Sequence, residues 1–129
     1  MATSDKTVLG EGVGLPGKMP LSLGLQVGDF VFTAGQVPYD EDGNVIEGGI
    51  EVQTRVVMER IRSILAEAGC TMDDVVKTHC YLQDTRDFER FNKTYGEYFG
   101  DKPPVRTTVR VDLIFDMKVE VEAIAYKPR

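Results

Sequence analysis

Apolar positions recur along this chain at two spacings, which separate the expected strands from the expected helices. Alternating or β-branched apolar residues favour strands, and five segments carry them: residues 21–27, 30–34, 75–82, 106–113 and 119–125. Apolar residues at helical spacing cover residues 50–68 and 88–99, which are followed by Gly69 and Gly100. The order β-β-α-β-α-β-β predicts an α+β fold in which two helices cover one face of a mixed sheet.

Glycine-containing steps mark the turns between these elements. Gly28-Asp29 predicts a tight turn between the first two strands, and Asp42-Gly43 predicts a second turn in the loop that leads to the first helix. Residues 1–17 are expected to be an irregular Gly-rich segment, because glycine occupies positions 10, 12, 14 and 17. A chain of 129 residues is expected to form a single domain, residues 1–129.

The sheet face that points away from the two helices has no third layer in the sequence to cover it. Tyr81, Ile124 and Tyr126 fall on this face, so it is partly apolar. An apolar sheet face that its own chain leaves uncovered is typical of a subunit interface. We therefore expect a homo-oligomer, with clefts between the subunits that could hold a small molecule.

Charged residues alternate with apolar ones in the last two expected strands. Arg106 and Arg110 share one face of the first, and Glu120 lies on the polar face of the second. If a short connection around Phe115 makes these strands neighbours, the polar faces adjoin, which predicts a carboxylate-binding site beside an acid/base group. An ordinary cross-strand ion pair between Arg110 and Glu120 would explain the same spacing about equally well.

Composition and charge limit the partners that we expect. The formal charge is −6 and the pI is near 4.8, which opposes unassisted binding to nucleic acid or to an anionic membrane. The start, MATSDKT, lacks a signal region, and no stretch is long enough to span a bilayer, so we expect a cytoplasmic protein. Cys70 and Cys80 are too few for a disulfide scaffold and are expected to be reduced, structural thiols.

Several kinds of chemistry find little support in the sequence. His79 is the only histidine, which excludes a multi-histidine metal site, and it adjoins Cys80 on an expected strand, so the two side chains point to opposite faces and form no dyad. The stretch GEGVGLPG has the glycines of a phosphate loop without its Lys-Ser/Thr ending. The aromatic residues from Phe88 to Phe99 recur at helical spacing without a basic surround, so they are expected in the core rather than against nucleic-acid bases.

Five segments that run in order along nearly the whole chain carry a more specific signal. They are FVFTAGQVPYD (30–40), GGIEVQTRVVMERIRSILAEAG (48–69), FNKTYGEYF (91–99), PPVRTTVRV (103–111) and KVEVEAIA (118–125). Together they resemble the Rid family, the YjgF or RidA-like group named for reactive intermediate deamination. The resemblance implies a chorismate-mutase-like fold and a homotrimer with sites between subunits. It also implies hydrolysis of enamine or imine intermediates, such as 2-aminoacrylate, to 2-keto acids and ammonia without a cofactor or a metal.

The resemblance further implies roles for individual residues. Arg106 matches the arginine that binds the substrate carboxylate, for which a planar guanidinium is well suited. Glu120 matches the glutamate that orients or activates the attacking water. Asn92 matches the asparagine of the family's helix, and Gly35 and Thr108 match positions whose backbone groups line the substrate site.

Three positions depart from the best-known RidA pattern. Leu21 stands where tyrosine is frequent, Ala34 replaces a serine, and Thr108 replaces a cysteine. Leu21 is also expected to line the substrate site, where the loss of a hydroxyl makes the pocket more apolar. The arginine and the glutamate are retained, so the resemblance supports the reaction type more than any particular substrate.

Other interpretations of these residues and of the fold stay open. An arginine on a strand is commonly a surface charge or an ion-pair partner, and Asn92 would also suit a polar boundary position on its helix. Because fold does not determine activity, a trimer of this kind could bind or regulate through a small ligand without turning it over. An endoribonuclease, a label attached to some relatives, is disfavoured by the acidic charge.

Overall fold

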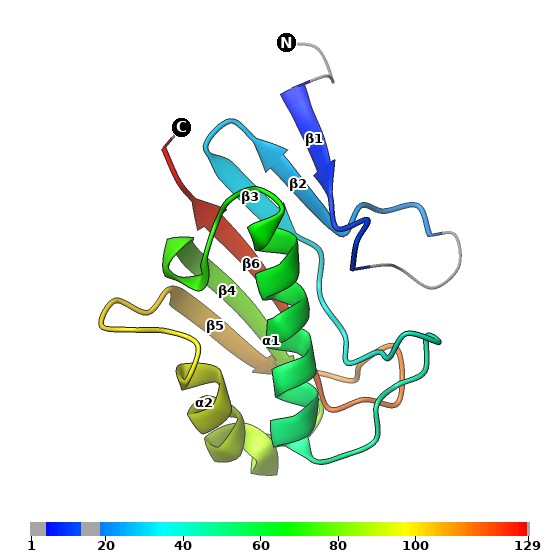
Figure 1. Ribbon diagram of the computed structural model, residues 1–129. Coiled ribbons are helices and arrows are strands. Elements are labelled where there is room, and N and C mark those ends of the chain that lie inside the picture. Colours follow the sequence, from blue (N-terminus) through cyan, green and yellow to red (C-terminus); the bar gives the residue numbers. More distant parts are fainter. Residues whose placement is uncertain (1–4, 14–18, 129) are drawn as a thin grey trace.

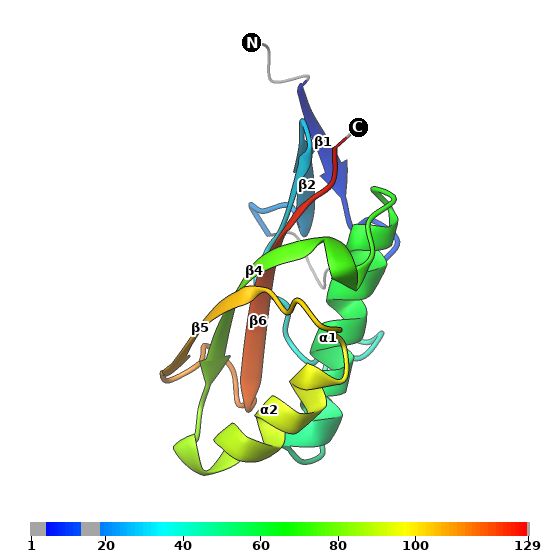
Figure 2. The same cartoon turned by 90° about the vertical axis from the view of Figure 1, so that its left-hand side faces the viewer.

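The protein has two layers, a six-stranded sheet and two helices on one of its faces (Figures 1 and 2). The computed structural model describes residues 5–13 and 19–128. Its strands are β1 (Lys6–Leu9), β2 (Gly24–Val27), β3 (Phe30–Thr33), β4 (Val75–Leu82), β5 (Val105–Arg110) and β6 (Val119–Tyr126). Its helices are α1 (Ile50–Ala66) and α2 (Phe88–Gly96), with short 3-10 turns η2 (Met72–Asp74) and η3 (Thr85–Asp87). The predicted α+β architecture is confirmed.

Strand β1 corrects the expectation that residues 1–17 are irregular. Lys6–Leu9 pairs antiparallel with β2, at the edge of the sheet. Leu9 is the only buried residue of this strand, so a four-residue segment offers almost no alternation from which to predict it. Gly10, which follows it, has a φ of 97°, whereas Gly14 and Gly17 lie outside the described residues.

Helix α1 packs its apolar stripe against the sheet and forms the centre of the core. Val57, Ile61 and Ile64 are fully buried on this side, together with Val31 and Val121 of the sheet. The helix ends at Ala66, and Gly69, the predicted stop three residues later, has a φ of 75° that favours glycine. The N–H of Cys70 then donates to the carbonyl of Leu65 at 3.0 Å, the closing bond of a Schellman motif.

Both predicted turns are confirmed. Val27 pairs with Phe30 across the two-residue turn Gly28-Asp29, in which Gly28 has a φ of 58°. In the second turn the carboxylate of Asp40 accepts hydrogen bonds from the N–H groups of Asp42 and Asn44, both at 2.9 Å. This loop brings residues 34–46 against the end of the sheet where the candidate site lies.

The order of the strands corrects the expected neighbourhood of the last two. β4 lies between β5 and β6, parallel to β5 and antiparallel to β6. The helix α2 carries the chain from the end of β4 across one face of the sheet, and a helical crossover of this kind makes the following strand parallel. β5 and β6 therefore form no hairpin, although they follow each other in sequence.

The second face of the sheet is covered by no described helix or strand, and we call it the open face (Figure 2). Phe30, Phe32, Tyr126 and Ile124 lie on it, and the ring of Phe30 packs 5.1 Å from that of Tyr126. The predicted placement of Tyr81, Ile124 and Tyr126 on this face is confirmed. None of the helices among the described residues is long and apolar enough to cross a membrane.

Candidate functional site

Glu120 lies on the open face near the start of β6 and is held against the backbone of Gly35. Neighbouring positions Val119 and Val121 point into the core, so the alternation of the strand turns Glu120 outward. Its Cγ and Cδ atoms would lie 3.2 and 2.9 Å from a Cβ added at Gly35, and its carboxylate would overlap that atom. Only a glycine leaves room for the observed position of this carboxylate.

A cavity of about 480 Å³ adjoins this carboxylate. Leu21, Ala34, Gly35 and Glu120, which the sequence linked through the family resemblance, all line it. Partial burial raises the pKa of Glu120, and the nearby carboxylate of Glu122 raises it further. Glu120 is therefore better placed to exchange protons near neutral pH than an exposed glutamate would be.

Arg106 lies on the other face of the sheet, where its guanidinium stacks on the aromatic side of α2. Its Cζ atom is 5.7 Å from the ring centre of Phe88, 5.6 Å from that of Phe91 and 5.0 Å from that of Tyr95. Such contacts hold a cation in place without neutralising it. None of the ion pairs among residues 5–13 and 19–128 includes Arg106, so its charge remains available to an anion.

Two polar side chains with unfilled hydrogen-bonding capacity accompany Arg106. Thr108 follows it on the same face of β5, and Asn92 lies one turn after Phe88 on α2. The Asn92 Oδ1 and Thr108 Oγ1 atoms are buried and have no hydrogen-bond partner within the described part of the chain. Buried polar atoms are normally paired, so these two are candidates for contacts to a ligand.

Cys80 lies beside this cluster but is a poor nucleophile. It is fully buried opposite Thr108 in the register of β4 and β5. Burial raises the pKa of the thiol to about 11, outweighing the opposing effects of Thr78 and Arg106. Its neighbour His79 points to the open face, opposite to Cys80 as predicted, and Cys70 is likewise buried.

The structure thus places Arg106 and Glu120 on opposite faces of the sheet, although they were expected to share one face. Arg106 pairs with Thr78 on the helix side of the sheet, whereas Glu120 pairs with Tyr81 on the open face, and β4 lies between them. We call Arg106, Asn92 and Thr108 the arginine half-site, and Glu120, Gly35 and Leu21 the glutamate half-site. The expectation that one hairpin presents Arg106 and Glu120 on a common face is wrong, because the β5 strand reaches the sheet through a helical crossover.

The alternative ion pair between Arg110 and Glu120 is also absent among the described residues. Arg110 pairs in register with Leu82, one strand away from β6. On the open face it is Glu122, not Glu120, that is engaged, since its carboxylate accepts a hydrogen bond of 2.6 Å from the hydroxyl of Tyr81. The Glu120 carboxylate is therefore left facing the cavity.

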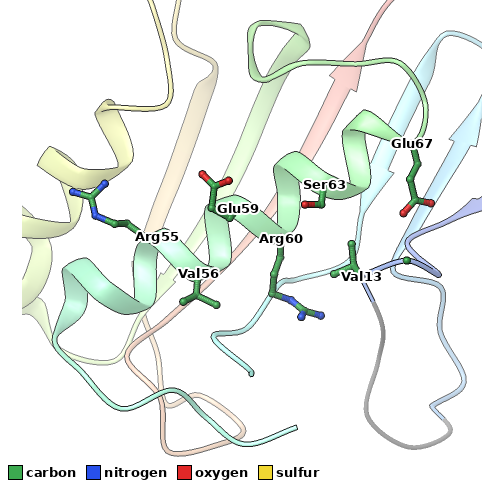
Figure 3. Close-up of a pocket in the computed structure, with 8 residues that line it drawn as sticks. Val13, Arg55, Val56, Glu59, Arg60, Ser63 and Glu67 are labelled. Carbon is green, nitrogen blue, oxygen red and sulfur yellow. The ribbon is translucent and has the colours of Figure 1, made fainter. Parts of the chain in front are cut away.

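A larger cavity of about 620 Å³ lies over the outer side of α1, but it gathers none of the expected site residues (Figure 3). Its charged groups are already engaged. Arg55 forms an ion pair with Glu97 at 2.7 Å, Glu67 accepts a hydrogen bond from the N–H of Gly10, and Arg60 donates to Gln36. We therefore place the candidate site at the smaller cavity beside Glu120.

Sequence reasoning missed the aromatic contacts of Arg106. The stripe from Phe88 to Phe99 was expected to be core, and Phe91 and Tyr95 are indeed buried. Phe88, however, is 41% exposed and contacts the guanidinium rather than the core. The available signal was its position as the first residue of the helix, at the end of the aromatic stripe.

If Glu120 is the acid/base group that the sequence predicts, replacing Gly35 with alanine is expected to lower turnover about 100-fold, because a displacement of about 1 Å in a catalytic group has costs of that order. The added methyl group would push the carboxylate of Glu120 out of its position. The rate of turnover and the melting temperature of the variant measure the effect and its specificity. Gly96→Ala is the matched control, since its added methyl group meets nothing within 4 Å. A Gly35→Ala variant with the wild-type rate would contradict this role.

The architecture and the two half-sites define an α+β protein of the chorismate-mutase-like fold that presents a free arginine and a half-buried glutamate. A family model described as endoribonuclease L-PSP matches residues 16–127. A RutC family protein of Pyrococcus abyssi is 48% identical over 110 residues, which cover 84% of this chain and 87% of the relative. The chain belongs to this family, the Rid/YjgF family.

Solved structures of family members agree with this assignment. The Rid family protein YyfA from Yersinia pestis superposes with a TM-score of 0.88 at 33% identity, covering 95% of this chain and 99% of that one. Escherichia coli TdcF, whose crystal structure contains bound serine, superposes with a TM-score of 0.86 at 30% identity, covering 95% of this chain and 99% of that one.

Proposed function

We propose that the protein hydrolyses reactive imines of 2-amino acids, formed directly or from their enamine tautomers, to 2-keto acids and ammonia. In this reaction water adds to the carbon of the C=N bond, and the carbon–nitrogen bond then breaks with release of ammonia. The observation that carries the proposal is the pair of half-sites. One offers a cation with no carboxylate partner among the described residues, and the other a carboxylate with a raised pKa beside a cavity.

Arg106 would bind the substrate carboxylate through two parallel hydrogen bonds. Its stacking on Phe88, Phe91 and Tyr95 holds the guanidinium plane before the substrate arrives, which lowers the entropic cost of binding. The unpaired Asn92 and Thr108 side chains could complete the contacts around the bound group. This half-site therefore positions the substrate.

Glu120 would manage the protons of the reaction. As a carboxylate it accepts a proton from the attacking water, and as a carboxylic acid it returns a proton to the departing nitrogen. One carboxyl group that changes protonation state during the reaction suffices for both steps. Its raised pKa suits this exchange.

The two half-sites can act on one substrate if they come from different subunits. We propose that the open face mediates assembly of a homotrimer in which the arginine half-site of one subunit meets the glutamate half-site of the next. The apolar side chains on that face, such as Phe30, Phe32 and Tyr126, support such an assembly. No nucleic acid or membrane is needed as a partner.

The proposal is tested by generating imines in solution with an L-amino-acid oxidase and measuring ammonia release in the presence of semicarbazide, which traps free imine. We expect the protein to lower semicarbazone formation and to accelerate ammonia release. Since Glu120 must be ionised to activate water, activity should fall as the pH is lowered through its raised pKa. Glu122→Gln removes the neighbouring negative charge, which should lower the pKa of Glu120. The fall in activity should then begin at a lower pH than in the wild type. Equal hydrolysis with and without the protein would rule out the deaminase function.

A second function, binding of a small carboxylate without turnover, is favoured by one observation. The family member TdcF holds serine, an amino acid with no C=N bond to hydrolyse. The same arginine half-site could bind such a ligand and transmit its presence to a partner. Calorimetry with serine separates the two functions, because binding without any imine hydrolysis would support the regulatory one.

A further inference from the structure

The cavity beside Glu120 has a predominantly apolar wall. Apart from Glu120, no charged side chain lines it among the described residues. The wall is made mainly of these side chains: Met19, Leu21, Leu23, Val37, Phe115 and Met117. Tyr39 also lines the cavity and adds one hydroxyl group. The apolar side chains of the wall form no hydrogen bonds with a polar substituent, but they can bury an apolar one.

Part of this wall remains in contact with water although its residues are large and apolar. Leu21 is 46% exposed and Phe115 is 48% exposed. The ring of Phe115 is nevertheless held in place, with its centre 5.7 Å from that of Tyr39 and the two rings at 60°. A ligand group that covered this surface would remove apolar area from water, which favours binding.

The reacting carbon of an imine substrate carries three groups: the nitrogen, the carboxylate and the amino-acid side chain. Under the proposed function, Arg106 takes the carboxylate and Glu120 serves the water and the nitrogen. The side chain is then the group left to occupy the apolar part of the cavity. In a single subunit the cavity has a volume of about 480 Å³, of which a methyl group would fill little.

We propose that this wall selects imines with large apolar side chains, those of the leucine, methionine and phenylalanine class, over the imine of alanine. This inference rests on the proposed deaminase function and assigns the substrate class of the same site. Burial of one methylene group favours binding roughly fourfold. The leucine imine has three more side-chain carbons than the alanine imine, so its kcat/KM is expected to be at least about tenfold higher.

The test compares kcat/KM for the imines of alanine and leucine, both generated by the same oxidase. Leu21→Asn is expected to lower the leucine-to-alanine ratio about tenfold, because it places an amide in the apolar wall. Val52→Asn is the matched control, since Val52 is also 46% exposed but lies on α1 outside the cavity, and it should keep the ratio.

The outcomes separate this inference from the function on which it rests. If both imines were hydrolysed and kcat/KM for the alanine imine equalled or exceeded that for the leucine imine, the assigned substrate class would be overturned. The proposed deaminase function would still stand. Hydrolysis of neither would overturn both. If Leu21→Asn changed the oligomeric state measured by light scattering and left the ratio unchanged, the wall would be a subunit contact and the inference would fail. A leucine preference that Leu21→Asn removes and Val52→Asn keeps supports it.

Discussion

Arg106→Ala is expected to lower kcat/KM for imine hydrolysis about 100- to 1000-fold. Removing one partner of a hydrogen-bonded charge pair has costs of about 2–5 kcal/mol, and each 1.4 kcal/mol is about tenfold in rate. The substrate carboxylate would lose its bidentate contact and the guanidinium that is held over Phe88, Phe91 and Tyr95. The measurement is ammonia release at several concentrations of enzymatically generated imine.

Two further variants show whether the loss of activity comes from the charge of Arg106 or from the planar geometry of its guanidinium, and whether it is specific to this arginine. Arg106→Lys keeps the positive charge but loses the planar fork, so its activity should lie between those of the wild type and Arg106→Ala. Arg110→Ala removes an exposed arginine from the end of the same strand and should leave the rate within about twofold. Thermal unfolding of each variant checks the fold. An Arg106→Ala protein that is folded and as active as the wild type would exclude this residue from substrate binding.

Most of the fold was predictable because its elements have strong local signals. The stripe of α1, the stop at Gly69 and the turn at Gly28-Asp29 all follow from properties of the residues themselves. β1 was missed because only one of its four side chains is buried. Its place in the sheet depends on pairing with β2, which local sequence does not encode.

The sequence named candidate site residues, but it did not predict how they are arranged in the fold. Leu21, Gly35 and Glu120 line one cavity, and Arg106 lies apart from them against α2, but the site roles that the family motifs assign to these residues stay predictions. Alternation gives the two faces of a strand, but it does not tell which face meets a helix or which strands are neighbours. β4 lies between β5 and β6, and the register of each strand on β4 turns Arg106 to the helix side and Glu120 to the open face. Under the proposed function, that separation leaves the site of one chain incomplete.

If complete sites form only between subunits, two inactive variants should restore each other. Arg106→Ala and Glu120→Gln are each expected to be nearly inactive alone. When equal amounts are unfolded together and refolded as mixed oligomers, half of the subunits supply an intact arginine half-site and half supply an intact glutamate half-site. A site that draws these from two neighbours is then intact in about one quarter of cases. Activity per subunit should recover to about one quarter of the wild-type value.

Mixing wild type with the double variant Arg106→Ala/Glu120→Gln provides the matched control. A site shared between neighbours again gives about one quarter of the activity, whereas a site within one chain gives about one half. The same distinction holds in the first experiment, where a site within one chain gives no recovery at all. Because Arg106 and Glu120 face opposite sides of a sheet that has β4 between them, we expect the shared result in both mixtures. If neither the equal mixture nor any other ratio of the two variants restored activity, one subunit would hold both residues of a site. The sheet edge would then have to rearrange on binding.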